Sequence, residues 1–212
     1  MPSPYNPPMN VWRDRLHRWL SPLALVCPLS PNTITLTALG LSLIAAACFY
    51  AGPHQPSLFL IGMVVVIVAG LADAFDGIVA RVQHRDSRYG DFLDHVCDRV
   101  ADVSLASGWM LGNGVREELA VGAIIVVMLN GYVGTQIEAT WGSREYASVG
   151  RGEFVLALIV FPIVSFILFS NGWSSMRAGT LTIPEWMTVL LVAFALLGIA
   201  QRLALASRIE RS

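Results

Sequence analysis

Six apolar segments separated by short polar connections constrain this chain more than any other feature. Each is close to the roughly 20 residues that a helix needs to cross about 30 Å of hydrocarbon. The composition agrees, because 55% of the residues are hydrophobic and only 14% are charged. The fold class we expect is an all-α integral membrane protein with six transmembrane helices. The predicted spans are residues 33–50, 58–81, 91–110, 119–139, 153–170 and 185–206.

The region before the first span is too charged to cross a membrane. Between its arginines, Trp12, Leu16, Trp19 and Leu20 recur at helical spacing. This pattern is typical of a helix that lies in the membrane interface, although a soluble amphipathic helix would show it too. We therefore expect residues 1–30 to form a tail and an interfacial amphipathic helix, and residues 31–212 to form the six-span domain.

The basic residues predict the orientation in the membrane. All 14 are arginines, so mechanisms that need a lysine are excluded. Six spans would place both termini on one side together with twelve of the arginines, leaving only Arg116 and Arg177 opposite. By the positive-inside rule that side is the cytoplasm, where we expect the active site of this multi-pass cell-membrane protein. The net charge of −1 and the lack of a basic tract argue against a nucleic-acid partner.

Aspartates gather at the cytoplasmic ends of the second and third spans. Seven of the eight lie between positions 73 and 102. Asp73 and Asp76 are one helical turn apart, as are Asp94 and Asp98, so each pair faces one side of its helix. If the two helices are antiparallel neighbours, four carboxylates converge. Burying four aspartates at membrane depth would cost on the order of 10 kcal/mol, so positive charge must lie among them.

Protons, arginines or metal ions could supply that charge. A proton relay needs fewer carboxyls, and one arginine cannot neutralise four. Oxygen ligands suit hard cations, and paired Mg²⁺ ions sharing carboxylates are common in phosphoryl chemistry, which favours a di-metal site. Zinc fits less well, because His95 and Cys97 do not share the face of the aspartates. Solvated helix ends or arginine ion pairs stay open as an alternative for the acidic residues.

Small residues beside the aspartates leave room for a bulky anion. Gly77 and Ala80 keep one face of the second span bare, and Gly90 does the same on the third. Arg81 lies on the adjoining turn and offers a guanidinium fork suited to phosphate oxygens. Close helix packing would also explain each glycine.

The full pattern Asp73-x-x-Asp76-Gly77-x-x-Ala80-Arg81, eight residues, Gly90-x-x-x-Asp94-x-x-x-Asp98 resembles the signature of the CDP-alcohol phosphotransferase family at all eight specified positions. Pro31-Asn32-x-x-Thr35 before the first span is also similar to an element of that family. The resemblance implies that an alcohol hydroxyl attacks the β-phosphorus of a CDP-linked alcohol, giving a phosphodiester and CMP. It also implies a homodimer.

The resemblance carries roles to individual positions. It implies that Asp73, Asp76, Asp94 and Asp98 hold two divalent cations, Mg²⁺ or Mn²⁺. Asp98 would be the general base and, with Asp94, forms the catalytic pair. The residues expected around the CDP-alcohol are Asn32, Thr35, Asp73, Gly77, Ala80, Arg81 and Gly90.

The acceptor alcohol is less defined by the sequence. Tyr132 and Gln136 lie one turn apart in an unusually polar part of the fourth span, and Arg144 and Arg151 follow it. These four are the candidate acceptor-binding residues. The two arginines either bind a phosphate of the acceptor or only fix the orientation of the protein in the membrane. Gly134 and Gln136 stand where the inositol-phosphate type would have arginines, which weakens that choice.

We expect a phospholipid-synthesis enzyme with CDP-diacylglycerol or CDP-archaeol as donor and a polyol phosphate, glycerol phosphate or inositol phosphate, as acceptor. An uncharged acceptor is the alternative: serine, or a diradylglycerol with a CDP-linked head group. A cation-coupled transporter would spread its acids through the membrane depth or repeat them in both halves, which this chain does not do. A catalytically inactive lipid-binding protein would not need the intact set of four aspartates.

Overall fold

The computed structural model describes residues 18–141 and 151–209, and most of these residues are helical. A first helix covers residues 18–26. A hairpin of two short strands precedes the last helix. No predicted span end is more than three residues from the observed one. The elements are α2 (Pro31–Ala51), α3 (Ser57–Val82), α4 (Arg88–Gly112), α5 (Glu117–Trp141), α6 (Arg151–Ser170), β1 (Arg177–Ala178), β2 (Leu181–Thr182) and α7 (Ile183–Ile209).

Five of these helices are long and apolar enough to cross a membrane: α2, α3, α5, α6 and α7. Helix α4 is also long enough to cross a membrane, but it carries several aspartates and is too charged to count among these five. It packs against α2 and α5, which reduces its exposure. The predicted all-α membrane fold is confirmed, with α4 as a sixth, charged helix of similar length.

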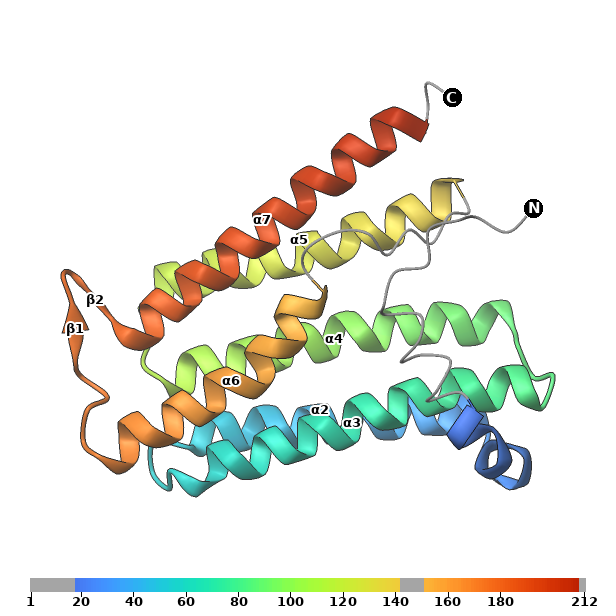
Figure 1. The fold of residues 1–212 in the computed structure, drawn as a ribbon, viewed down its shortest axis with the longest axis horizontal. Coiled ribbons are helices and arrows are strands. Elements are labelled where there is room, and N and C mark those ends of the chain that lie inside the picture. The colour runs from blue at the N-terminus through green and yellow to red at the C-terminus, as the bar shows by residue number, and fades with distance from the viewer. Residues whose placement is uncertain (1–17, 142–150, 210–212) are drawn as a thin grey trace.

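The six long helices alternate in direction (Figure 1). Helices α2, α3 and α4 pack together through α2, and α5 packs against α7. Contacts of α4 with α5, and of α6 with α3 and α7, join the two groups. The end of α3, the start of α4 and the far ends of α5 and α7 point toward the same end of the bundle (Figure 1). That end holds the aspartates and is called the site end below.

Glycines on α4 allow the backbones of α2 and α4 to approach closely. A Cβ atom on Gly108 would collide with the backbone carbonyl of Ala46, and one on Gly112 with that of Phe49. Only a residue without a side chain fits at such positions, as is common where membrane helices pack. The next residue after Gly108, Trp109, donates a hydrogen bond of 3.0 Å to Ser165 Oγ on α6.

An ion pair joins two helices at the end of the bundle opposite the aspartates. Arg116 Nε donates to Glu185 Oε1 across 2.6 Å, joining the start of α5 to the start of α7. The other carboxylate oxygen of Glu185 accepts a bond from the Thr182 backbone, and Thr182 Oγ1 accepts one from the Glu185 backbone. This is a capping box, which begins α7 directly after the hairpin.

The helix of residues 18–26 lies against the site end of α3. Ala24 is fully buried, whereas Trp19 is 83% exposed, so the helix has one packed and one open apolar face. Gln83, just after α3, donates to the carbonyl oxygens of Ala24 and Cys27 at 2.7 and 2.9 Å. These bonds satisfy carbonyls at the end of the short helix. Trp12 and Leu16 of the predicted interfacial helix lie outside the described residues.

Candidate active site

Three carboxylates come together between α3 and α4. Asp73, Asp76 and Asp94 each offer one oxygen atom, and these atoms lie within 4.8 Å of one another. Asp76 is only 6% exposed. A charged carboxylate this deeply buried beside two others needs a compensating cation. Hard divalent cations prefer all-oxygen sites of this kind, so the donor set fits Mg²⁺ or Mn²⁺.

Helix α2 forms the floor beneath these carboxylates, because it packs against both α3 and α4. Its contact face is built from small buried residues, among them Ala38, Ser42 and Ala45. The aspartates of α3 and α4 therefore meet where both helices pack on α2. From the sequence we expect α3 and α4 to be direct neighbours. In the structure they make few contacts with each other, and α2 lies between them as the common partner.

The connection between α3 and α4 is a tight turn with local hydrogen bonds. His84 has a left-handed backbone, with φ of 54°, and the Arg85 backbone donates to the Ala80 carbonyl at 2.8 Å. This closes α3 by a Schellman-type bond. Ser87 then begins α4, its hydroxyl accepting from the Gly90 backbone at 3.0 Å. These local stops fix where the two acidic stretches lie along their helices.

The start of α2 contacts one of the carboxylates through Thr35 and lies beside the start of α4 through Asn32. The buried Thr35 hydroxyl donates to Asp76 Oδ2 across 2.6 Å. Thr35 thus touches a candidate metal ligand directly. A Cβ atom on Gly90 would lie 3.4 Å from Asn32 Oδ1, so these two predicted CDP contacts lie close together.

The remaining predicted CDP contacts lie on the last turns of α3. The Arg81 guanidinium folds back toward Gly77, where a Cβ atom would be 3.5 Å from Arg81 Nη1. Arg81 is exposed and Ala80 is partly buried. The bare turn at Gly77 therefore lies directly beneath a solvent-accessible guanidinium, an arrangement that suits a phosphate-bearing ligand.

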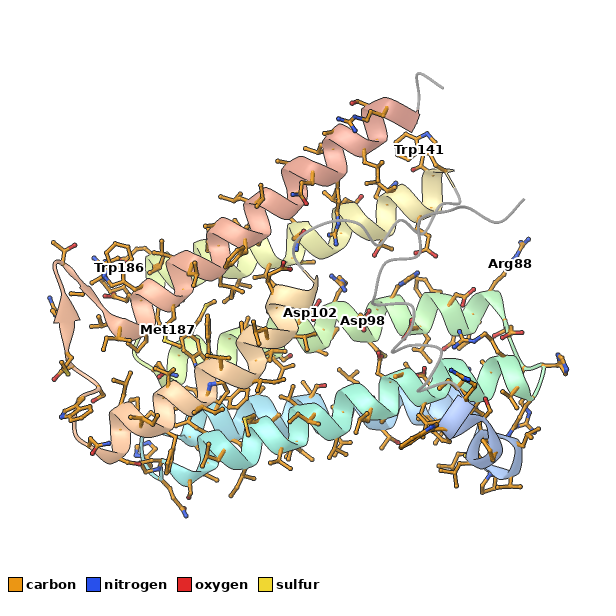
Figure 2. All side chains as sticks on the ribbon, viewed as in Figure 1. Arg88, Asp98, Asp102, Trp141, Trp186 and Met187 are labelled. Atoms are coloured by element: carbon orange, nitrogen blue, oxygen red, sulfur yellow. The ribbon has the colours of Figure 1, made fainter. Side chains whose placement is uncertain are left out.

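Asp98 is not part of the group of three carboxylates whose oxygen atoms lie within 4.8 Å of one another. It lies one turn along α4 from Asp94 and one turn before Asp102, and Figure 2 shows Asp98 and Asp102 in succession on that helix. Its Oδ2 atom is 3.6 Å from Arg99 Nη2. A carboxylate next to the metal candidates, but also held by a neighbouring cation, is suitably placed to handle a proton beside a bound ion.

The candidate acceptor residues are only partly described. Tyr132 is 56% exposed, and Gln136 one turn later is also exposed, so both lie on one open face of α5. Arg151 is the first residue of α6, and its side chain is not described. Arg144 lies outside the described residues.

Arg202 is a residue near this region that sequence reasoning missed as a site residue. It reaches from α7 to α5, where Nη1 donates to Asn130 Oδ1 at 2.8 Å and to the Asn130 backbone carbonyl. A Cβ atom on Gly134 would lie 3.2 Å from the same nitrogen. An arginine inside an apolar span, opposite a helical glycine, was the signal that could have identified it.

Residues 28–200 match the sequence model of the CDP-alcohol phosphatidyltransferase family. The chain belongs to this family. It is therefore a divalent-metal-dependent membrane enzyme of phospholipid synthesis that transfers a phosphate-linked group from a CDP-alcohol to a hydroxyl and releases CMP. Membership confirms the predicted reaction class and removes the transporter interpretation.

Relatives of this CDP-alcohol phosphatidyltransferase share moderate identity over most of their length. The archaetidylinositol phosphate synthase of Pyrococcus horikoshii is 28% identical over 168 residues, covering 79% of this chain and 85% of the relative. The phosphatidylinositol phosphate synthase of Mycobacteroides abscessus is 29% identical over 162 residues, covering 72% of each chain.

Solved structures share the fold. The phosphatidylinositol phosphate synthase of Mycobacterium tuberculosis, in complex with manganese and citrate, aligns with a TM-score of 0.65 at 22% identity, covering 88% of each chain. The same synthase with CDP-DAG bound aligns with a TM-score of 0.65 at 21% identity, covering 89% of this chain and 94% of that one. The helical arrangement described above is thus that of a known membrane synthase.

Proposed function

We propose that this enzyme transfers a phosphatidyl-type group from CDP-diacylglycerol or CDP-archaeol to a polyol phosphate, with inositol phosphate as the first candidate. The observation that carries this proposal is the Arg202 guanidinium lying against Gly134 of α5. An arginine is expected at position 134 in the inositol-phosphate type, and Arg202 supplies the same group from α7. The two relatives named above, both synthases of inositol phosphate lipids, support the same acceptor.

In this proposal Asp73, Asp76, Asp94 and Asp98 hold two divalent ions. Asp73, Asp76 and Asp94 form the close group, and Asp98 extends it by one turn of α4. The ions, when bound, neutralise charge on the diphosphate of the donor and on the CMP leaving group. Thr35 keeps the Asp76 carboxylate in place from below through its hydrogen bond.

The donor occupies the space beside this group. Gly77 and Ala80 leave room along α3, and Arg81 pairs with a phosphate of the diphosphate. Asn32 and Gly90 line the opposite side, where α2 begins and α4 makes its first turn. Thr35 and Asp73 complete the donor contacts at the base of this space.

Asp98 acts as the general base, with Asp94 beside it as the second catalytic residue. The acceptor hydroxyl loses its proton to Asp98 as its oxygen forms a bond to the β-phosphorus. The bond between that phosphorus and the CMP oxygen breaks, and CMP leaves with the electron pair. The products are a phosphodiester lipid and CMP, and no covalent enzyme intermediate is needed.

The acceptor phosphate lies on the α5 side of Asp98. Tyr132 and Gln136 contact the polyol from the exposed face of α5, while Arg202, Arg144 and Arg151 surround the phosphate. Guanidinium groups bind phosphate through paired, charge-assisted hydrogen bonds, which gives both affinity and orientation.

A panel of acceptors in a CMP-release assay tests the proposal. Purified enzyme receives CDP-diacylglycerol or CDP-archaeol with inositol phosphate, glycerol phosphate, free inositol or serine, and the lipid product is identified by mass. We expect CMP release that depends on a polyol phosphate, and no product from the Asp98→Asn variant. Turnover with serine or free inositol and none with either phosphate would establish the uncharged-acceptor alternative instead.

We also propose that the site end and both termini face the cytoplasm, and that residues 31–212 act as one six-span unit behind an interfacial N-terminal helix. Cysteines can be introduced singly into a variant lacking the native ones. Ser175→Cys should react with an impermeant thiol reagent on intact cells, and Ser207→Cys only after permeabilisation. The reverse pattern would contradict this orientation. A homodimer is tested by cross-linking in native membranes.

A further inference from the structure

Arg99 joins the catalytic helix α4 to the acceptor helix α5. Its Nη2 atom is 3.1 Å from Asp102 Oδ2 and 3.6 Å from Asp98 Oδ2. Asp98 and Asp102 follow one another along α4 in Figure 2, so the guanidinium lies beside two successive turns. One arginine thus contacts the proposed general base and a second carboxylate that is not among the proposed metal ligands.

Gly131 on α5 provides the space for this guanidinium. A Cβ atom built at position 131 would collide with Arg99 Nη1, and it would also approach the end of the Arg99 stem. No residue other than glycine therefore fits while Arg99 keeps this position. Gly131 precedes Tyr132 directly, so the same turn of α5 that receives Arg99 carries a candidate acceptor contact.

The arrangement is not the one that stability alone would select. Arg99 Nε is buried and has no hydrogen-bond partner among the described residues. A buried donor without a partner costs about 1–3 kcal/mol. Gly131 adds a further cost of roughly 1 kcal/mol relative to alanine in a helix interior. Features that cost stability and meet at a reaction centre point to a role in the reaction.

We propose that Arg99 is a positioning residue for Asp98. Held by Asp102 and seated against Gly131, the guanidinium fixes the Asp98 carboxylate on the side of α4 that faces α5, where the acceptor hydroxyl must arrive. Arg99 touches neither substrate and acts through Asp98. The inference rests on the proposed function only in taking Asp98 as the group that accepts the proton.

The test compares Arg99→Ala, Arg99→Lys and Gly131→Ala, with Gly122→Ala as a matched control on α5 where a Cβ atom would meet nothing within 4 Å. We expect Arg99→Ala to lower kcat about ten- to a hundredfold, because small displacements of reacting groups have effects of this size. The KM for the CDP-lipid should stay within about twofold, since the donor residues lie on α2, α3 and the first turn of α4. Gly122→Ala should retain parental kinetics.

A double-mutant cycle separates positioning from simple packing. Gly131→Ala should lower kcat strongly when residue 99 is arginine, because the guanidinium is displaced. It should have little further effect in the Arg99→Lys or Arg99→Ala background, since a lysine ammonium is compact and flexible. Thermal unfolding with and without CDP-lipid reports whether each variant is folded and still binds donor.

Parental kcat in Arg99→Ala, alongside an inactive Asp98→Asn, would overturn this inference and leave the proposed function intact. Equal losses from Gly131→Ala in all three backgrounds would also overturn it. Activity in Asp98→Asn would instead remove the proposed base. If Arg99→Ala does not fold, the effect of Gly131→Ala on kcat is compared between the parent and the Arg99→Lys variant instead.

Discussion

Thr35 Oγ1 lies 2.6 Å from Asp76 Oδ2 and donates a hydrogen bond to it, although the two residues are 41 positions apart in the chain. Both side chains are buried. The bond ties the start of α2 to the last turns of α3 and orients a carboxylate that belongs to the three-aspartate group. Loss of a group that orients a metal ligand through a hydrogen bond typically weakens metal affinity or activity ten- to a hundredfold.

Replacement of Thr35 by valine should therefore raise the Mg²⁺ or Mn²⁺ concentration needed for half-maximal activity by about tenfold or more. Thr35→Ser keeps the donor and should stay close to the parent. Thr37→Val is the matched control, because Thr37 bonds only to the Thr33 carbonyl in the same helix among the bonds described for it. An unchanged metal requirement in Thr35→Val would contradict the orienting role.

Removal of divalent cations should abolish turnover. The grouped aspartates and the donor diphosphate are both anionic, so bound donor without metal would leave several negative charges close together. Activity is measured by CMP release after exhaustive chelation and again after Mg²⁺ or Mn²⁺ is added back. Full turnover in chelator would disprove the metal site.

The Asp98→Asn variant should lose turnover while retaining most of its donor binding. An amide occupies the same space as the carboxylate but cannot take up the acceptor proton. Donor binding is followed by the thermal shift that CDP-diacylglycerol produces, and turnover by CMP release. Near-parental turnover would mean that another group is the base.

Replacing the arginines proposed to bind the acceptor should change the KM for the acceptor but not the KM for the donor. Arg202→Ala and Arg151→Ala should raise the KM for the polyol phosphate about ten- to a hundredfold, since charge-assisted hydrogen bonds contribute roughly 1.5–3 kcal/mol. The donor KM should barely change. Arg208→Ala, an exposed position further along α7, is the control. The same test on Arg144 covers the segment outside the described residues. Unchanged acceptor kinetics in all the variants would favour an uncharged acceptor.

Alanine should have different effects at a glycine in the α2–α4 contact and at a glycine on an open face of α5. Gly108→Ala should destabilise the protein by about 1–3 kcal/mol, because the added methyl group meets the Ala46 backbone, which cannot move aside easily. Gly122→Ala should be neutral or stabilising by up to about 1 kcal/mol, since its Cβ atom would be in open space. Thermal unfolding in one detergent measures both. Equal stabilities would contradict the close approach.

Some of the site is visible in the sequence because it depends on neighbouring residues alone. Helical geometry places Asp73 with Asp76 on one face whatever the rest of the fold does. The start of α4 at Ser87 and the end of α3 before His84 follow from local capping chemistry, so the predicted spans match the observed helices closely. The eight-position motif also predicted the family, which the comparison of residues 28–200 confirmed.

Other features depend on which helices pack together and how each is rotated, and a local pattern does not contain that information. The placement of α2 beneath the aspartates, which makes Thr35 a partner of Asp76, is one of them. The contacts of Arg99 with Gly131 and of Arg202 with Gly134 are others, since each brings a side chain of one helix against the backbone of another.

The sequence by itself thus determined the membrane class, the helix boundaries and the acidic motif, because periodicity, capping and residue spacing act over one or two turns. The reaction class followed from the resemblance of that motif to a known family. Only the tertiary structure decided that three of the four aspartates meet closely while Asp98 stands one turn apart, and that Arg99 and Arg202 reach α5. The physical reason is that these contacts join residues on different helices, which spacing along the chain does not specify. Those of Arg99 and Arg202 form where a glycine of α5 has no Cβ atom.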